Sequence, residues 1–162
     1  YTVPAELSRA SDSYRFVVTE SRVGSYRFID RYSHGSGDLT LVMPEVYEPA
    51  LGAHTDSSYQ RPHFTFGEEL VVLSYHYGFT YLLGGGQTGS HMFKVMIAPA
   101  WLPTEPTHAM DFPDFSALPG YNETWFAPVG ASVEVFGGVT KVTVTPEGSE
   151  TTISESSITL AE

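Results

Sequence analysis

The residues of this chain with the clearest chemical use are three histidines on or beside its most regular hydrophobic stretch: His54, His63 and His76. Glu68 and Glu69 lie near them in the sequence. Imidazole and carboxylate ligands on adjacent strands suit iron, manganese, zinc or nickel. The sequence has no two histidines one residue apart with a glutamate following, the spacing that such sites commonly use. We therefore expect no metal and no other cofactor, and keep the three histidines as the alternative ligands.

Hydrolytic chemistry has little support in the spacing of the hydroxyl and acidic residues. The serines form no Gly-x-Ser-x-Gly motif, and the glycine-rich run 84–89 lacks the lysine of a phosphate-binding loop. Asp111 and Asp114 are a conceivable pair of glycosidase carboxylates, but Asp-Phe-Pro-Asp is more typical of a turn. We expect no enzymatic activity, with a cupin-like metalloenzyme as the minor alternative.

Aromatic residues are the third chemical signal, with ten Tyr, ten Phe and two Trp. Sugars stack on exposed rings, so Trp101, Tyr121 and Trp125 beside Asp111 or Glu123 suggest a carbohydrate-binding platform. More often, such rings fill the core of a β-sandwich and its rims. The residues that we select as binding or interface candidates are Tyr59, Trp101, Phe112, Phe115, Tyr121 and Trp125.

Composition narrows the function classes. At 162 residues the chain is long enough for one domain with its own core. It has no cysteine, which excludes disulfides and thiolate sites. The net charge is −11 and the eight basic residues are scattered, so we expect no direct binding to nucleic acid. No apolar run approaches the roughly 20 residues of a spanning helix, and the first ten residues lack a signal-peptide pattern.

A depletion of amides accompanies the acidic composition. Asn122 is the only asparagine, and Gln60 and Gln87 are the only glutamines, while proline is plentiful. This combination is typical of heat-adapted proteins, and GC-rich coding would also produce it.

Strands must position these side chains, because the hydrophobic pattern repeats every two residues. From Val71 to Leu83 every odd position is apolar or aromatic, which predicts a strand. A glycine-rich turn and the alternating stretch 91–97 then complete a β-hairpin. Further strands are predicted at 14–19, 25–32, 38–43, 63–66, 124–127, 131–136, 139–145 and 151–160.

The turns and loops between these strands carry glycine and proline. We expect turns at Gly24, at Gly137-Gly138 and at 146–148, and we expect the last strand, rich in Ser, Thr and Glu, to be an edge strand. Two long connections, 44–61 and 101–121, are of the kind that Greek-key topologies need. The second carries many aromatics, which favours an ordered flap packed on a sheet.

These elements predict an all-β fold: one antiparallel β-sandwich or barrel of the jelly-roll type, with two long loops. The domain is expected to span 14–162, preceded by an arm or edge segment at 1–13. One local oddity, Gly89-Ser90-His91-Met92, reads like the remnant of a cleaved expression tag, although the alternation continues smoothly into Phe93, which favours natural sequence.

In strand number, long loops, low charge density and amide depletion over about 14–160, the chain resembles the single jelly-roll coat proteins of tailless icosahedral double-stranded DNA viruses, including those of thermophilic phages. The resemblance implies a capsid protein of the virion that self-assembles with its own copies or with a second coat protein. The two long loops would make lateral contacts, and residues 1–13 would order on a neighbour. An acidic surface suits a shell above an internal viral membrane. The alternative is a secreted, extracellular carbohydrate-binding sandwich.

Overall fold

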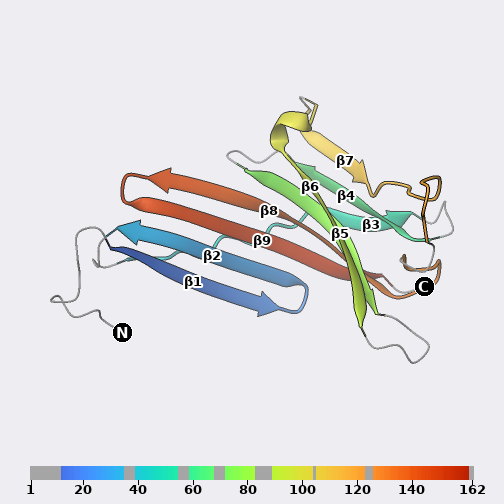
Figure 1. The fold of residues 1–162 in the computed structure, drawn as a ribbon, viewed down its shortest axis with the longest axis horizontal. Coiled ribbons are helices and arrows are strands. Elements are labelled where there is room, and N and C mark those ends of the chain that lie inside the picture. The colour runs from blue at the N-terminus through green and yellow to red at the C-terminus, as the bar shows by residue number, and fades with distance from the viewer. Residues whose placement is uncertain are drawn as a thin grey trace.

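The described part of the chain folds into two antiparallel sheets, one of six strands and one of three (Figure 1). The structure is a computed structural model, and it describes residues 12–34, 39–54, 59–67, 72–82, 89–103, 105–122 and 126–160. Besides strands, these ranges contain a single three-residue 3-10 turn, Pro99–Trp101. Nothing in the same ranges is a helix long and apolar enough to cross a membrane.

The larger sheet has the spatial order β1-β2-β9-β8-β5-β6. Every neighbouring pair is antiparallel, and β1-β2, β8-β9 and β5-β6 are hairpins of consecutive strands. The strands are β1 (Ser13–Arg22), β2 (Ser25–His34), β5 (Ser74–Leu82), β6 (Ser90–Ile97), β8 (Val133–Thr145) and β9 (Gly148–Leu160).

The smaller sheet has the order β3-β4-β7, formed by Ala50–His54, Arg61–Gly67 and Thr107–Asp111. In β4 the buried side chains of Phe64 and Phe66 alternate with outward polar ones, as a strand with one wet face requires. The chain passes between the two sheets after β2, β4, β6 and β7.

The core lies between the sheets and consists largely of aromatic rings. Phe64 of the smaller sheet stacks on Tyr77 of the larger one, with ring centroids 5.3 Å apart. Phe79 contacts the rings of Phe93 and Phe112. Phe64, Tyr77, Phe79 and Phe112 belong to one buried cluster, and the partly buried Phe93 packs against it. Such pairs add roughly 0.5–1.5 kcal/mol each beyond their burial.

The smaller sheet covers only part of the larger one (Figure 1). Over β2 and β9, residues 39–49 lie on the same inner face instead. The backbone N–H of Tyr47 donates to Ser154 Oγ at 2.7 Å, and Ser154 Oγ donates to the carbonyl of Glu45 at 2.6 Å. This segment therefore completes the sandwich without forming a strand.

The expected hairpin turn at Gly137-Gly138 is wrong, because β8 runs unbroken through both glycines. A Cβ at Gly137 would lie 2.6 Å from Cδ2 of Phe64, on the inner face. A Cβ at Gly138 would lie 2.6 Å from Nε2 of His76, on the outer face. Neither position has room for a side chain, because the Phe64 ring covers Gly137, and the His76 ring and the backbone carbonyl of Ser154 lie against Gly138.

Other strand predictions also need correction. Residues 39–43 form no strand. The segment that follows them contains Pro44 and Pro49, and the backbone N–H of Tyr47 bonds to the Ser154 side chain instead of to a neighbouring strand. The final strand is central rather than an edge, because β9 pairs with both β2 and β8. Phe126 and Ala127 are not in a strand. The sequence reading missed β7, a short strand in the second long connection.

The expected all-β antiparallel sandwich is confirmed, and its described strands form no closed barrel. The predicted hairpins at Gly24, between β5 and β6, and at 146–148 are present, and the last has its two turn residues at 146–147. Each predicted long connection contains one strand of the smaller sheet. Residues 1–11 of the expected arm lie outside the described residues.

Candidate interaction surface

The larger sheet has an outer face that points away from the smaller sheet. Residues that pair across antiparallel strands lie on the same face of the sheet. The register, followed from His76 across all six strands, therefore identifies the residues that share its face. We call this surface the outer face. It comprises residues 15, 17, 19 and 21 of β1, 26, 28, 30 and 32 of β2, 149–159 (odd) of β9, 134–144 (even) of β8, 74–80 (even) of β5 and 92, 94 and 96 of β6.

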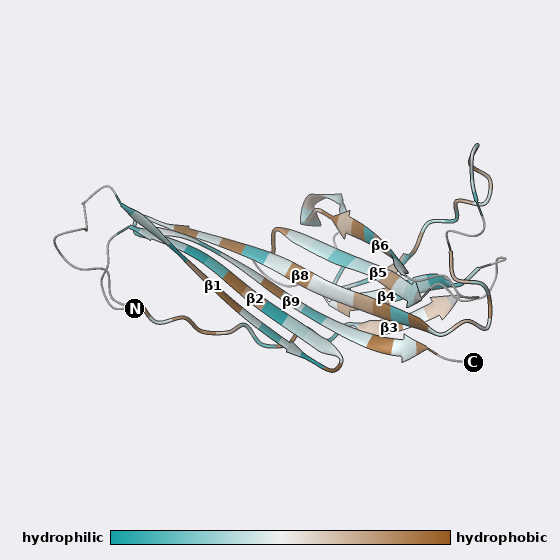
Figure 2. Cartoon of the chain, turned by 60° about the horizontal axis from the view of Figure 1, so that its bottom comes forward, coloured by the Kyte–Doolittle hydropathy of each residue, from teal (hydrophilic) through white to brown (hydrophobic). Residues whose placement is uncertain are grey.

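Large apolar side chains are exposed at both ends of the outer face. At the β6 edge, Met92 and Met96 are 67% and 63% exposed. At the β1 edge and the far end of β8, Val17, Tyr32 and Val144 are 51%, 44% and 77% exposed. Hydrophobic and hydrophilic residues alternate along these strands (Figure 2). The outer face is therefore more apolar than the charge of the chain suggests.

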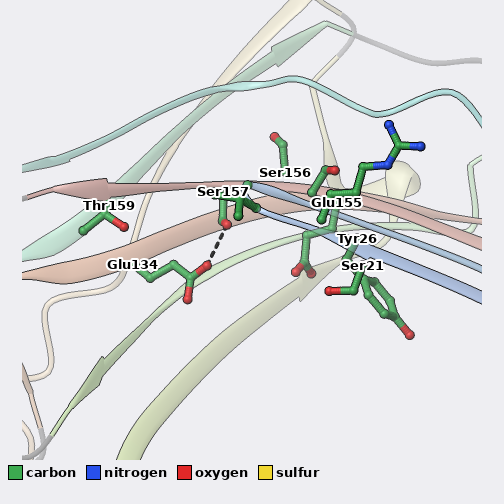
Figure 3. Close-up of a pocket in the computed structure, with 11 residues that line it drawn as sticks. Ser21, Tyr26, Glu134, Glu155, Ser156, Ser157 and Thr159 are labelled. Atoms are coloured by element: carbon green, nitrogen blue, oxygen red, sulfur yellow. Dashed lines mark hydrogen bonds between the residues drawn. The ribbon is translucent and has the colours of Figure 1, made fainter.

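Two adjoining hollows lie on and beside the outer face. One, of about 330 Å³, lies at the end of the β1-β2 hairpin and is lined mainly by hydroxyl and carboxyl side chains (Figure 3). The other, of about 300 Å³, is lined by Met92, Phe136 and Ile153 among others. Tyr26, Glu134 and Glu155 line both hollows.

A polar row crosses the outer face beneath these hollows. His76, Gly138 and Glu155 are neighbours in register on β5, β8 and β9. Because Gly138 has no side chain, the His76 ring reaches across β8, and its Nε2 lies 2.9 Å from Glu155 Oε2. Lys94 Nζ lies 3.8 Å from the same oxygen and 5.9 Å from the Phe136 ring centroid. The carboxylate of Glu155 is thus already engaged by two protein groups.

The second carboxylate of the hollows has a separate partner. Ser157 Oγ donates to Glu134 Oε1 at 2.7 Å (Figure 3). In register, Glu134 pairs with residue 159, four positions from Glu155, which corresponds to roughly 13 Å along the strand. The two residues therefore start from well-separated backbone positions on β8 and β9, and each carboxylate has its own protein partner.

A hydroxyl, an imidazole and a carboxylate meet on the solvent side of the smaller sheet. His63 Nδ1 lies 2.6 Å from Asp111 Oδ1, and His63 Nε2 lies 3.0 Å from Thr65 Oγ1. In this order a carboxylate orients an imidazole that could accept a hydroxyl proton. Ala50 and Gly52 are the neighbours in register, so the row is open to solvent. Sequence spacing alone missed it, because Asp111 comes from β7.

The aromatic candidates chosen from the sequence lie mostly in the core. Tyr59 and Phe112 are 1% and 2% exposed, and Phe115 and Tyr121 pack against the core cluster. Tyr59 also donates to Asp114 Oδ1 at 3.1 Å. These four interface candidates therefore lie in the core or against it, and Tyr121 is the one among them that also belongs to the expected carbohydrate platform. Trp101 is 84% exposed, and Trp125 lies outside the described residues.

The three candidate histidines do not share one sheet. His54 and His63 belong to the paired strands β3 and β4 of the smaller sheet, two register positions apart, whereas His76 is buried on the outer face of the larger sheet. Among the described residues, no group of three or more His, Asp or Glu side chains could hold a metal ion. Asp111 and Asp114, considered as an acid pair, have different partners, His63 and Tyr59.

Comparisons of the chain with protein-family models, with curated proteins and with solved structures found no match.

Proposed function

We propose that this protein is a structural coat protein of a virion, whose β-sandwich packs laterally with copies of itself or with a companion capsid protein. The observation that carries the proposal is the outer face, which exposes Val17, Tyr32, Met92, Met96 and Val144. Exposed apolar side chains that are grouped mark contacts with a partner more often than scattered ones do. These side chains stand towards the β1 edge and the β6 edge of one sheet, where lateral neighbours in a shell would meet them.

Two further features support an assembly role. The two carboxylates that line the hollows already have protein partners, since Glu155 lies beside His76 and Lys94, and Glu134 accepts a hydrogen bond from Ser157. The sandwich fold is also the class expected from the resemblance to single jelly-roll coat proteins. The proposed location is the virion, with an internal viral membrane as a further contact of the shell.

Concentration-dependent association tests this proposal. We expect sedimentation velocity to detect dimers or larger species that grow with protein concentration. The double variant Met92→Gln, Met96→Gln should weaken association at least tenfold, because it removes apolar area from the outer face. The matched control is Val42→Gln, which changes a 74% exposed valine on residues 39–49. Equal association of both variants would contradict a role for the β6 end of the outer face.

A carbohydrate-binding module, secreted to the extracellular space, is the second candidate function. The paired hollows favour it, because Tyr26 offers a ring, and Glu134, Glu155 and Ser157 offer acceptors and a donor to sugar hydroxyls. Calorimetric titration with a panel of glycans tests it. A heat of binding that is lost in Tyr26→Ala would support sugar binding, and no heat with any glycan would count against it.

A further inference from the structure

We infer that β1 pairs edge to edge with β1 of a second copy of this chain, in antiparallel fashion, so that two larger sheets join into one continuous sheet. This inference rests on the proposed assembly function and identifies the strand edge through which two copies first associate. The partner is a second copy because the edge is complementary to itself in backbone groups, apolar side chains and charge.

The direction of the backbone groups follows from the register. Gly24 O accepts a hydrogen bond from Ser157 N at 2.9 Å, and His34 N donates to Glu147 O at 2.8 Å. The even-numbered residues of β2 therefore form their backbone hydrogen bonds with β9. The odd-numbered residues of β2 form theirs with β1. Their partners on β1 are even-numbered, since Val18 pairs with Ile29. The N–H and C=O groups of residues 15, 17, 19 and 21 consequently point to the open edge.

No described strand pairs with this edge. Natural proteins usually protect such edges with short strands, bulges, proline or charged side chains. β1 has ten residues, contains no proline and pairs with β2 without a bulge. It therefore keeps the features of a strand that accepts a partner.

The charges of β1 are neutralised within one copy. Arg15 makes two hydrogen bonds to Asp30, of 2.9 and 2.8 Å, which hold the pKa of that carboxyl below its ordinary value. Glu20 pairs with Arg22 and Arg27. At the middle of the strand, Val17 and Val18 are 51% and 38% exposed. An apolar centre thus lies between charges that already have partners.

A two-fold axis at Val17 gives the best register. Val17 then faces Val17 of the second copy on the outer face, and Phe16 faces Val18 of the second copy on the inner face. Arg15 faces Thr19 of the second copy, so no like charges lie opposite each other. A two-fold axis at Val18 would instead place Phe16 opposite Glu20 of the second copy.

Single-cysteine variants test this register, because the chain has no cysteine of its own. The two Val17 Cα atoms would lie about 5.5 Å apart as a hydrogen-bonded pair, within the span of a disulfide. Under mild oxidation we expect Val17→Cys to form covalent dimers at least tenfold faster than Thr19→Cys, whose copies would lie roughly 14 Å apart along the strands. Val144→Cys controls for random collision on the outer face.

A second variant tests the hydrogen bonds. Val17→Pro removes an N–H that points away from β2, so the β1-β2 ladder remains intact, as proline on edge strands allows. We expect unchanged circular dichroism and at least tenfold weaker dimerisation in sedimentation velocity. Cross-linking of Val17→Cys no faster than Thr19→Cys would overturn the inference. If the wild type still associates in that case, only the edge pairing fails; a wild type that is monomeric throughout overturns the proposed function as well.

Discussion

Two adjacent glycines decide how closely side chains approach the larger sheet from its two sides. Phe64 packs over Gly137 from the smaller sheet, and the His76 ring crosses Gly138 on the outer face. The sequence pattern suggested a turn, because a Gly-Gly pair between two alternating stretches is the usual signal of a hairpin. Only the strand pairing reveals that close packing, and not a positive φ angle, requires glycine here.

Alanine at either glycine should destabilise the fold. Gly137→Ala would push Cβ into the Phe64 ring, and Gly138→Ala would displace His76 from Glu155. We expect each to lower the free energy of unfolding by about 1–3 kcal/mol, as overpacking does. Urea denaturation measures this. Gly52→Ala is the matched control, because its Cβ would meet nothing within 4 Å, and an equal loss there would contradict the explanation.

Tyr77 links stability to alkaline pH. Burial raises its pKa to about 12, and its hydroxyl donates to the Asp111 carbonyl at 2.7 Å. Because the folded pKa lies above the unfolded value of about 10, this contribution is complete below pH 10 and is lost as the pH rises to about 12. We expect a loss of roughly 2 kcal/mol over that range. In Tyr77→Phe the alkaline loss should be smaller; an unchanged pH profile would contradict this assignment.

At the scale of elements, residues 39–49 replace a strand over the inner face of β2 and β9. Ser154 is 3% exposed, and its hydroxyl holds both Tyr47 and Glu45. We expect Ser154→Ala to cost about 1–3 kcal/mol, because two part-buried hydrogen bonds lose their side-chain partner. Amide exchange at Tyr47 should accelerate accordingly. Ser157→Ala, which removes an exposed bond to Glu134, should leave exchange at Tyr47 unchanged.

The sequence predicted the elements whose pattern is local. Strict alternation from Val71 to Leu83 identified β5, and the turn at Gly24 identified the first hairpin. The central place of β9 could not be predicted, because its Ser and Thr side chains look solvent-facing until β2 and residues 39–49 are seen beside it. The candidate surface was missed for a similar reason, since its residues come from all six strands of the larger sheet.

At the scale of the whole molecule, net charge and exposed apolar area have opposite effects on the association of copies. A net charge of −11 makes copies repel, while β1 and the outer face offer apolar and backbone contacts. Salt shortens the Debye length from about 10 Å at 0.1 M to about 3 Å at 1 M. We therefore expect the dissociation constant of the dimer to fall as the sodium chloride concentration rises over this range. Weaker association at high salt would indicate contacts dominated by ion pairs instead.

The most direct test of the assembly function is native mass spectrometry of the untagged protein over a range of concentrations, because one spectrum reports subunit number and bound ions together. We predict dimers or larger species without metal, whose share grows with concentration. A monomer at every concentration that carries one divalent ion would contradict it, and would direct attention to His54, His63 and His76.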